Sequence, residues 1–303
     1  MEMYLFVSFI IFYCTVYFLS FVGNVIVLCR CYWTKQRRSS SIRWFIANLA
    51  FSDLTFTMLS LFDYISHVWT WLGGNVSCKL QGFLIEACYT TSILTLVVIS
   101  FERRKAVVTP FSARATATNN KKRKIIAIWT ASLVIGSPLL YAYQVDMHPS
   151  GLLLCTNTSF GDLGKQVYYS IHGVCTFIIP LTYMIYAQST IFLTLRSRAL
   201  TTRNSFTTAP NNCHRKVAKT LAAYSFAFAV CWAPFMINRT LAYFHLADGA
   251  GEYTWIGCQL LIFLNTVLDP ILYGIYGENK KASFRHFFTC TRFHMSTRTA
   301  DIS

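Results

Sequence analysis

The chain has 303 residues, of which 54% are hydrophobic and 13% are charged, and its net charge is +15. Soluble domains carry about 25% charged residues, so this composition argues against a soluble globular enzyme, and the many apolar side chains exclude a disordered chain. Basic soluble proteins often bind nucleic acid, but the basic residues here flank apolar segments, so we expect no nucleic-acid partner.

Seven apolar segments follow one another along the chain. Each approaches or exceeds the roughly 20 residues that a helix needs to cross a bilayer. Helices satisfy their own backbone hydrogen bonds in lipid, whereas a membrane barrel would need short strands of alternating polarity. We therefore predict an all-α membrane protein, a bundle of seven transmembrane helices. The predicted segments are Tyr4–Cys31, Ile42–Leu72, Cys78–Val107, Ile125–Tyr143, Gln166–Leu195, Val217–Phe244 and Tyr253–Tyr276.

The connections between these segments differ in charge. One side of the predicted bundle holds 24 of the 27 Lys and Arg residues, and the exceptions are Lys79, Lys165 and Arg239. An excess of basic residues in short loops marks the cytoplasmic side and attracts the anionic lipid of the bilayer. We therefore expect a multi-pass protein of the plasma membrane with its N-terminus outside.

Two kinds of residue on the predicted outer side agree with this orientation. The tripeptides Asn75-Val-Ser77 and Asn157-Thr-Ser159 are glycosylation sequons, which predicts glycans on Asn75 and Asn157. Cys78 and Cys155 also fall outside, where a disulfide can form. From the residues alone, these cysteines are either bonded to one another or two free thiols.

The seven predicted spans and the first outer loop, which contains Trp71-Leu72-Gly73, carry short motifs. They are Gly23-Asn24-Val25, Asn48-Leu49-Ala50-Phe51-Ser52-Asp53-Leu54, Trp71-Leu72-Gly73, Glu102-Arg103-Arg104, Trp129 with Pro138, Pro180, Phe228 through Phe235 with Trp232 and Pro234, and Asn265 followed by Asp269-Pro270-Ile271-Leu272-Tyr273. In this order they resemble the motifs of rhodopsin-like (class A) G-protein-coupled receptors. The resemblance covers nearly the whole chain, and the amino-acid sequence of the third segment is similar to that of peptide-receptor members.

The resemblance implies a division of the chain into three parts. Residues 1–278 form the seven-transmembrane receptor domain, 279–290 a short C-terminal amphipathic helix and 291–303 a cytoplasmic tail. An amphipathic helix of this kind lies in the membrane interface. Cys290 at its end is either a palmitoylation site or a free thiol.

Two carboxylates fall inside predicted spans. An ionised group at that depth is costly and normally faces a water-filled interior. The resemblance implies a hydrated pocket formed by Asp53, Ser92, Asn265 and Asp269, with Asn24 nearby, that holds an allosteric sodium ion. The alternatives are a water network without an ion, or one protonated carboxylate. No other cofactor is expected.

The resemblance also implies an activation switch. In this scheme Arg103 pairs with Glu102 at rest and turns to the G-protein on activation, while prolines act as hinge points. The simpler alternatives are static kinks, core aromatic rings and an arginine that extends to the interface. The implied switch residues are Glu102, Arg103, Phe228, Trp232, Pro234, Asp269, Pro270 and Tyr273.

Three positions depart from the family's pattern. Arg104 replaces the usual Tyr, His214 stands where many members carry an acid that clamps Arg103, and Gln188 stands where the fifth helix usually offers a Tyr. A missing clamp predicts raised basal activity, whereas a missing Tyr predicts a weaker active state. The sequence does not say which effect dominates.

The ligand pocket is predicted from the outer halves of the spans. Two acids, one arginine and several aromatic rings suit a small charged ligand or a short peptide, and the alternative is that the charges neutralise one another. Phe263 stands where an opsin needs its lysine and Ile85 where amine receptors hold an acid, which disfavours retinal and amines. The candidate residues are Asp63, His67, Glu86, Tyr89, Trp232, Met236, Arg239 and Gln259.

These observations predict a receptor that binds an extracellular ligand and activates a heterotrimeric G-protein by a population shift, with arrestin as a further partner. One alternative is a decoy receptor that binds without signalling. Another is a small-solute transporter, which would show repeated halves, and the chain shows none. An enzyme is not expected, because its histidines show no convergent spacing.

Overall fold

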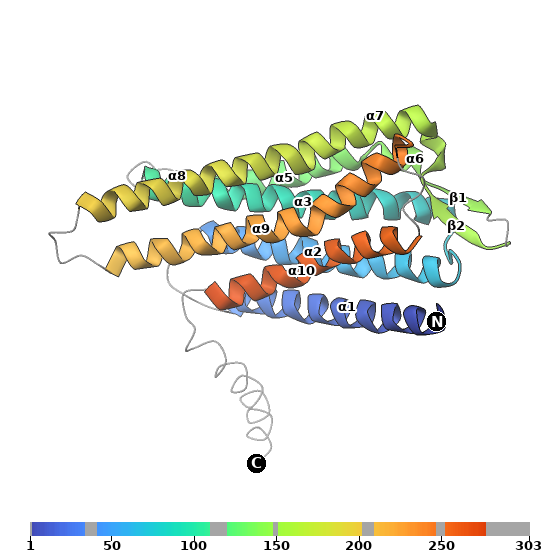
Figure 1. The fold of residues 1–303 in the computed structure, drawn as a ribbon, viewed down its shortest axis with the longest axis horizontal. Coiled ribbons are helices and arrows are strands. Elements are labelled where there is room, and N and C mark those ends of the chain that lie inside the picture. Colours follow the sequence, from blue (N-terminus) through green and yellow to red (C-terminus); the bar gives the residue numbers. More distant parts are fainter. Residues whose placement is uncertain are drawn as a thin grey trace, which may run out of the picture.

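The computed structural model describes residues 2–33, 41–109, 120–147, 151–201, 209–246 and 252–276. The elements are α1 (Glu2–Trp33), α2 (Ser41–Val68), α3 (Asn75–Val108), α5 (Lys121–Gly136), α6 (Leu139–Ala142), β1 (Gln144–Met147), β2 (Leu153–Thr156), the 3₁₀ turn η1 (Thr158–Phe160), α7 (Gly161–Gly173), the π-helical η2 (Val174–Ile178), α8 (Ile179–Thr201), α9 (Ala209–Tyr243) and α10 (Glu252–Tyr276). Figure 1 shows the long helices lying lengthwise in one bundle, with the β1–β2 hairpin and the start of α1 at the same end.

Within these ranges, seven helical segments are long and apolar enough to cross a membrane. The fourth, Lys121–Ala142, combines α5 and α6, and the fifth, Thr158–Arg198, runs from η1 through α8. The prediction of a seven-helix membrane bundle is confirmed. The predicted amphipathic helix, the tail and Cys290 lie outside the described residues.

The predicted segments differ from the structure at several points, and two of these differences have a local cause. The second helix ends at Val68 rather than Leu72, because the Trp71 backbone N–H instead donates to Leu153 O of β2 (2.7 Å). The fourth segment is not one continuous helix, because α5 ends at Gly136 and α6 begins after Pro138. Proline has no N–H to donate and its ring clashes with the preceding turn.

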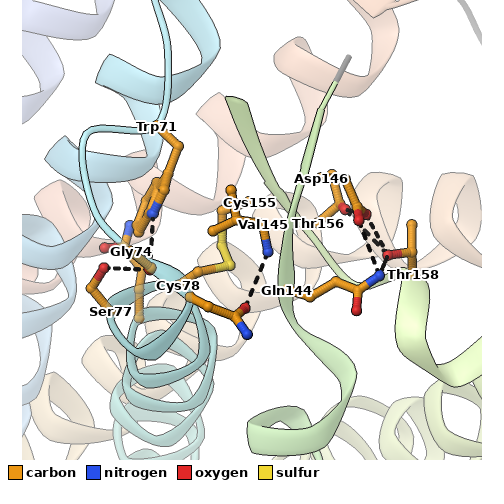
Figure 2. The surroundings of a disulfide bond; sticks show 12 residues. Trp71, Gly74, Ser77, Cys78, Gln144, Val145, Asp146, Cys155, Thr156 and Thr158 are labelled. Carbon is orange, nitrogen blue, oxygen red and sulfur yellow. Dashed lines mark hydrogen bonds between the residues drawn. A yellow bond between two sulfur atoms is a disulfide. The ribbon is translucent and has the colours of Figure 1, made fainter. Parts of the chain in front are cut away.

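A β-hairpin that the sequence did not predict covers the outer end of α3. Strands β1 and β2 are antiparallel, with Val145 opposite Cys155. The Cys78–Cys155 disulfide joins β2 to α3 (Figure 2), which confirms that the two outer cysteines are paired. The Val145 N–H also donates to Asn75 Oδ1 (3.2 Å) at the start of α3, so the hairpin is held at two points.

The hairpin carries one carboxylate with three hydrogen-bond donors. The hydroxyl groups of Thr156 and Thr158 donate to Asp146 Oδ2, and Gln144 Nε2 donates to Asp146 Oδ1 (3.0 Å). These hydrogen bonds favour the charged form and hold the pKa of Asp146 below its ordinary value. The rim of the bundle therefore keeps a fixed negative charge.

Helix α3 is the central element of the bundle. In the apolar 18-residue stretch of α3, 67% of the residues are buried inside the bundle, whereas the figure for the corresponding stretch of α1 is 28%. The main core cluster lies where α3 meets α2, α8, α9 and α10, and a second cluster lies around Phe45, Ile99, Ile191 and Leu221. The functional side chains on α3 are therefore surrounded by other helices rather than by lipid.

One close approach fixes the turn between the fourth span and the hairpin. Gly82 of α3 packs against the ring of Tyr143, and a Cβ at this glycine would lie 2.4 Å from Tyr143 Cδ2. An ordinary side chain at position 82 therefore forces the ring to move.

We expect Gly82→Ala to lower the free energy of unfolding by about 1–3 kcal/mol, the usual cost of overpacking. The midpoint of thermal unfolding of the purified chain in detergent measures it. Gly74→Ala is the matched control, because no atom lies within 4 Å of a Cβ at that glycine. Equal midpoints for the two variants would contradict the packing described here.

Candidate functional site

A buried cluster of charged and polar side chains joins three helices in the outer half of the bundle. His172 of α7 lies at its centre, and its Nε2 contacts Glu86 Oε1 of α3 and the Tyr89 hydroxyl group (2.6 Å). Its Nδ1 lies 3.1 Å from Arg239 Nη2 of α9. The exposed fractions of Glu86, His172 and Arg239 are only 4%, 2% and 5%.

The donors and acceptors in this cluster define one proton arrangement. Arginine is always protonated and has only donors, so His172 Nδ1 must accept from Arg239. The imidazole Nε2 then carries a hydrogen and donates to the Glu86 carboxylate. The imidazole thus bridges a buried anion and a buried cation, which compensates two charges that would otherwise be costly at this depth.

Aromatic rings hold the Arg239 guanidinium from two sides. Its carbon lies 4.5 Å from the Tyr169 ring centroid and 5.2 Å from that of Phe235, which are favourable cation–π distances. Nη2 also contacts Met236 Sδ (3.1 Å). The cation therefore has a defined position toward the outer end of α9.

The structure brings together part of the predicted ligand set. Asp63 is elsewhere: it is half-buried on α2 and interacts electrostatically with Tyr13. Gln259 is half-buried on α10, and the side chain of His67 lies outside the described part of the chain. The predicted residues that do form one contiguous group are Glu86, Tyr89, Trp232, Met236 and Arg239.

Below this group, aromatic rings lead toward the middle of the bundle. The ring centroids of Tyr89 and Trp232 are 4.9 Å apart, and those of Trp232 and Phe228 are 6.1 Å apart. Tyr89 and Trp232 line one side of a small cavity, and its polar wall includes Asp53, Ser92 and Asn265. Tyr89 and Trp232 therefore border the same small cavity as three residues of the predicted ion pocket.

Several oxygens of the predicted ion pocket lack a partner. Asp53 and Asn265 line this cavity, whereas Asn24 and Asp269 line a second one. Ser92 Oγ donates to Asp53 Oδ1 (2.6 Å) and lies 2.8 Å from Ser52 Oγ. Among the described residues, four buried side-chain oxygens of the predicted pocket have no hydrogen-bond partner: Asn24 Oδ1, Asp53 Oδ2, Asn265 Oδ1 and Asp269 Oδ2. Buried polar atoms are normally satisfied, so this set of hard oxygens fits water or a cation.

Other motif residues fix the helices around that pocket. Asn24 Nδ2 of α1 donates to Thr266 O of α10 (3.1 Å). Asn48 of α2 donates to Thr95 Oγ1 of α3 (2.8 Å) and accepts from Trp129 Nε1 of α5 (2.9 Å). These amides therefore join five helices by bonds between elements far apart in sequence.

The inner end of α3 carries contacts to two neighbouring helices. The Glu102 carboxylate forms an ion pair with Lys124 of α5, a partner that sequence reasoning did not name. Arg104, which departs from the family's pattern, stacks on Tyr186 of α8 at 5.0 Å and donates to its hydroxyl group (3.0 Å). The neighbouring Arg103 lies on the same turn of α3.

Two prolines of the predicted switch lie inside continuous helices. Pro234 is within α9 and Pro270 is within α10. A Cβ at Gly23 of α1 would lie 3.1 Å from the Pro270 ring, so α1 packs closely at this point. Asp269, Pro270 and Tyr273 line a second small cavity next to Tyr224.

The two sequons occupy different surroundings. Asn75 is exposed and accepts from Val145 N through its Oδ1. The amide nitrogen of Asn157, the atom that a glycan would occupy, donates to the hydroxyl groups of Tyr169 (2.7 Å) and Tyr243 (3.1 Å). Glycosylation stays a prediction at both residues.

Sequence reasoning missed the central residue of the outer cluster. It treated the histidines as unrelated because they fall on different segments. A usable signal was present, since an ionisable side chain inside a predicted span, such as His172, marks a functional position by default. Its partners Glu86 and Arg239 lie 86 and 67 residues away from it in the sequence and meet it only in the fold.

Comparison with known proteins identifies the family. The sequence profile of the 7 transmembrane receptor (rhodopsin family) matches residues 23–273. The chain is 25% identical to a QRFP-like peptide receptor of Branchiostoma floridae, over 93% of this chain and 77% of that receptor. It is 26% identical to the human substance-P receptor, with 90% and 69% covered, and to the human neurotensin receptor type 1, with 84% and 68% covered.

These receptors are not enzymes, which agrees with the expectation from the sequence. The match extends from the first span to the last, and it includes the pocket and switch positions described above. The chain therefore belongs to the rhodopsin family of seven-transmembrane receptors, and is a multi-pass membrane protein similar to receptors for peptides.

Proposed function

We propose that this receptor binds a short peptide, or another small charged ligand, outside the cell and activates a heterotrimeric G-protein by shifting a conformational equilibrium. One observation carries the proposal: the buried Glu86–His172–Arg239 cluster contacts Tyr89, which together with Trp232 lines the cavity that contains Asp53. The names of the similar receptors support a peptide as the ligand.

The geometry supports a route from ligand to the inner end. A ligand group that bonds to Arg239 or Tyr89 competes for the donors and acceptors of His172, and this disturbs the Tyr89 ring that packs against Trp232. Trp232 lies two residues before Pro234, where α9 lacks one backbone hydrogen bond and bends most readily. A ligand shifts the equilibrium only by its differential affinity for the two states.

The orientation in the membrane follows from the same arrangement. The hairpin and the start of α1 lie at one end of the bundle (Figure 1), and the Lys and Arg residues concentrate in the connections at the other end. In this proposal the hairpin faces outward, and the basic end faces the cytoplasm, where the G-protein and arrestin bind.

Nucleotide exchange tests the proposal directly. The receptor in lipid nanodiscs should accelerate nucleotide exchange on at least one heterotrimer when a library of short peptides is added. We expect Arg103→Ala to lower this acceleration at least tenfold, because a charge-assisted hydrogen bond contributes about 1.5–3 kcal/mol. Ligand binding without any exchange would instead favour the decoy receptor.

The polar pocket supports a second element of the proposal, an allosteric sodium ion. The residues present fit such an ion, because carboxylate, hydroxyl and amide oxygens are hard ligands and several of them lack a partner. Asp53, Ser92, Asn265 and Asp269 would hold it, and its charge would compensate the two neighbouring carboxylates. Bound sodium then stabilises the resting conformation and lowers the affinity for an agonist.

We expect the purified receptor to unfold at least about 2 °C higher in sodium chloride than in the chloride of a bulky organic cation, because a bound ion stabilises the folded state. Asp53→Asn should remove this difference. Ser132→Ala is the control, since Ser132 is fully buried on α5 but donates only to Ile128 O and should preserve it. A sodium effect that persists in Asp53→Asn would contradict the assignment.

The outer cluster generates a prediction about ligand binding. For a peptide that activates the native receptor, Arg239→Ala should lower the potency roughly 10- to 100-fold, because a buried charge-assisted hydrogen bond is lost. Lys165→Ala is the matched control: this outer cation lies over the Tyr243 ring at 5.9 Å and outside the cluster. If a dose–response measurement shows equal losses of potency for both variants, Arg239 is not part of the ligand site.

A further inference from the structure

One side chain joins the inner halves of α8 and α9 by two hydrogen bonds. Gln188 Nε2 of α8 donates to the backbone Leu221 O of α9 (2.8 Å) and to Ser225 Oγ of the same helix. Leu221 and Ser225 are both buried, and Gln188 is half-buried. A single primary amide therefore uses both of its hydrogens to hold one turn of α9.

The bonds lie within an apolar contact region. Leu221 belongs to the core cluster with Ile191 of α8 and Ile99 of α3. Polar groups in such surroundings have no access to bulk water, and breaking a buried hydrogen bond leaves a donor and an acceptor unsatisfied. The two bonds accordingly oppose any motion that separates α9 from α8 at this level.

We propose that Gln188 is a latch that holds α9 against α8 in the conformation described here and so sets the level of signalling without ligand. The inference rests on the proposed function, in which the G-protein binds between the inner ends of the helices. In this chain the latch replaces the clamp whose acid is absent at position 214. Gln188 thus restrains basal activity rather than merely weakening the active state.

The structure predicts a graded effect of removing the bonds. Each hydrogen bond of about 1 kcal/mol shifts a two-state equilibrium roughly fivefold. Ser225→Ala removes one partner but leaves the Leu221 carbonyl, whereas Gln188→Leu removes both bonds and keeps a side chain of similar size. We expect ligand-free nucleotide exchange to rise about fivefold in Ser225→Ala and more than tenfold in Gln188→Leu.

The experiment uses the full-length receptor in nanodiscs. Ligand-free exchange is compared among the native chain, Ser225→Ala, Gln188→Leu and Gln188→Met. The second substitution at Gln188 keeps the test valid if one of the two variants fails to fold. Ser189→Ala is the matched control, because Ser189 is exposed on the same turn of α8 and should leave exchange unchanged. A second readout needs no G-protein. It is the fluorescence of a solvent-sensitive amino acid that replaces Lys219, an exposed residue of α9, and it reports movement of that helix.

The two readouts separate the latch from the proposed function. A fluorescence change in the Gln188 variants, absent in Ser189→Ala, supports the latch even if no variant activates any G-protein, in which case only the proposed function fails. Exchange that rises in the order native, Ser225→Ala, Gln188→Leu supports both. Native-like fluorescence and native-like exchange in both Gln188 variants would overturn the latch.

Discussion

Compensation of charge inside the bundle is the constraint on which this receptor's site depends. Glu86 and Arg239 are almost fully buried, and neither contacts bulk water that could solvate it. His172 lies between them, and accepts from the guanidinium while donating to the carboxylate. Because breaking a buried pair leaves an uncompensated charge, these three side chains stay together unless another polar group takes the place of one of them. That dependence makes the cluster responsive to a ligand.

The same constraint operates differently in the middle of the bundle. There, Asp53 and Asp269 are two neighbouring acids with no basic partner between them in the described part of the chain, and several buried oxygens around them have no hydrogen-bond partner. A cation or a proton is the natural compensation for two neighbouring carboxylates. The outer cluster is thus compensated by protein side chains, whereas in our proposal the inner pocket takes up a cation from solution. Tyr89 of the outer group lines the same small cavity as Asp53 and Asn265.

At the inner end, polar side chains join neighbouring helices, and two of them, Arg104 and Gln188, depart from the family's pattern. Arg104 stacks on Tyr186 and so joins α3 to α8, and Gln188 joins α8 to α9. Lys124 binds Glu102 and joins α5 to α3. The Arg104 and Lys124 contacts are only partly buried, so water can replace them when they break, whereas the Gln188 bonds go to buried groups of α9. Such contacts are weaker than the core packing and are suited to break and re-form between two states.

The amino-acid order alone determined the seven spans, their membrane character and the family, because continuous apolar runs and motifs within one helix are local properties of the chain. It also singled out Asp53, Trp232 and the outer cysteines. Only the tertiary structure decided that His172 bridges Glu86 and Arg239, that Lys124 pairs with Glu102, and that a hairpin covers α3. Helices that are apolar on all sides carry no sequence signal for which face meets which neighbour, so the partners of a buried polar group are set by the rotation and packing of the helices.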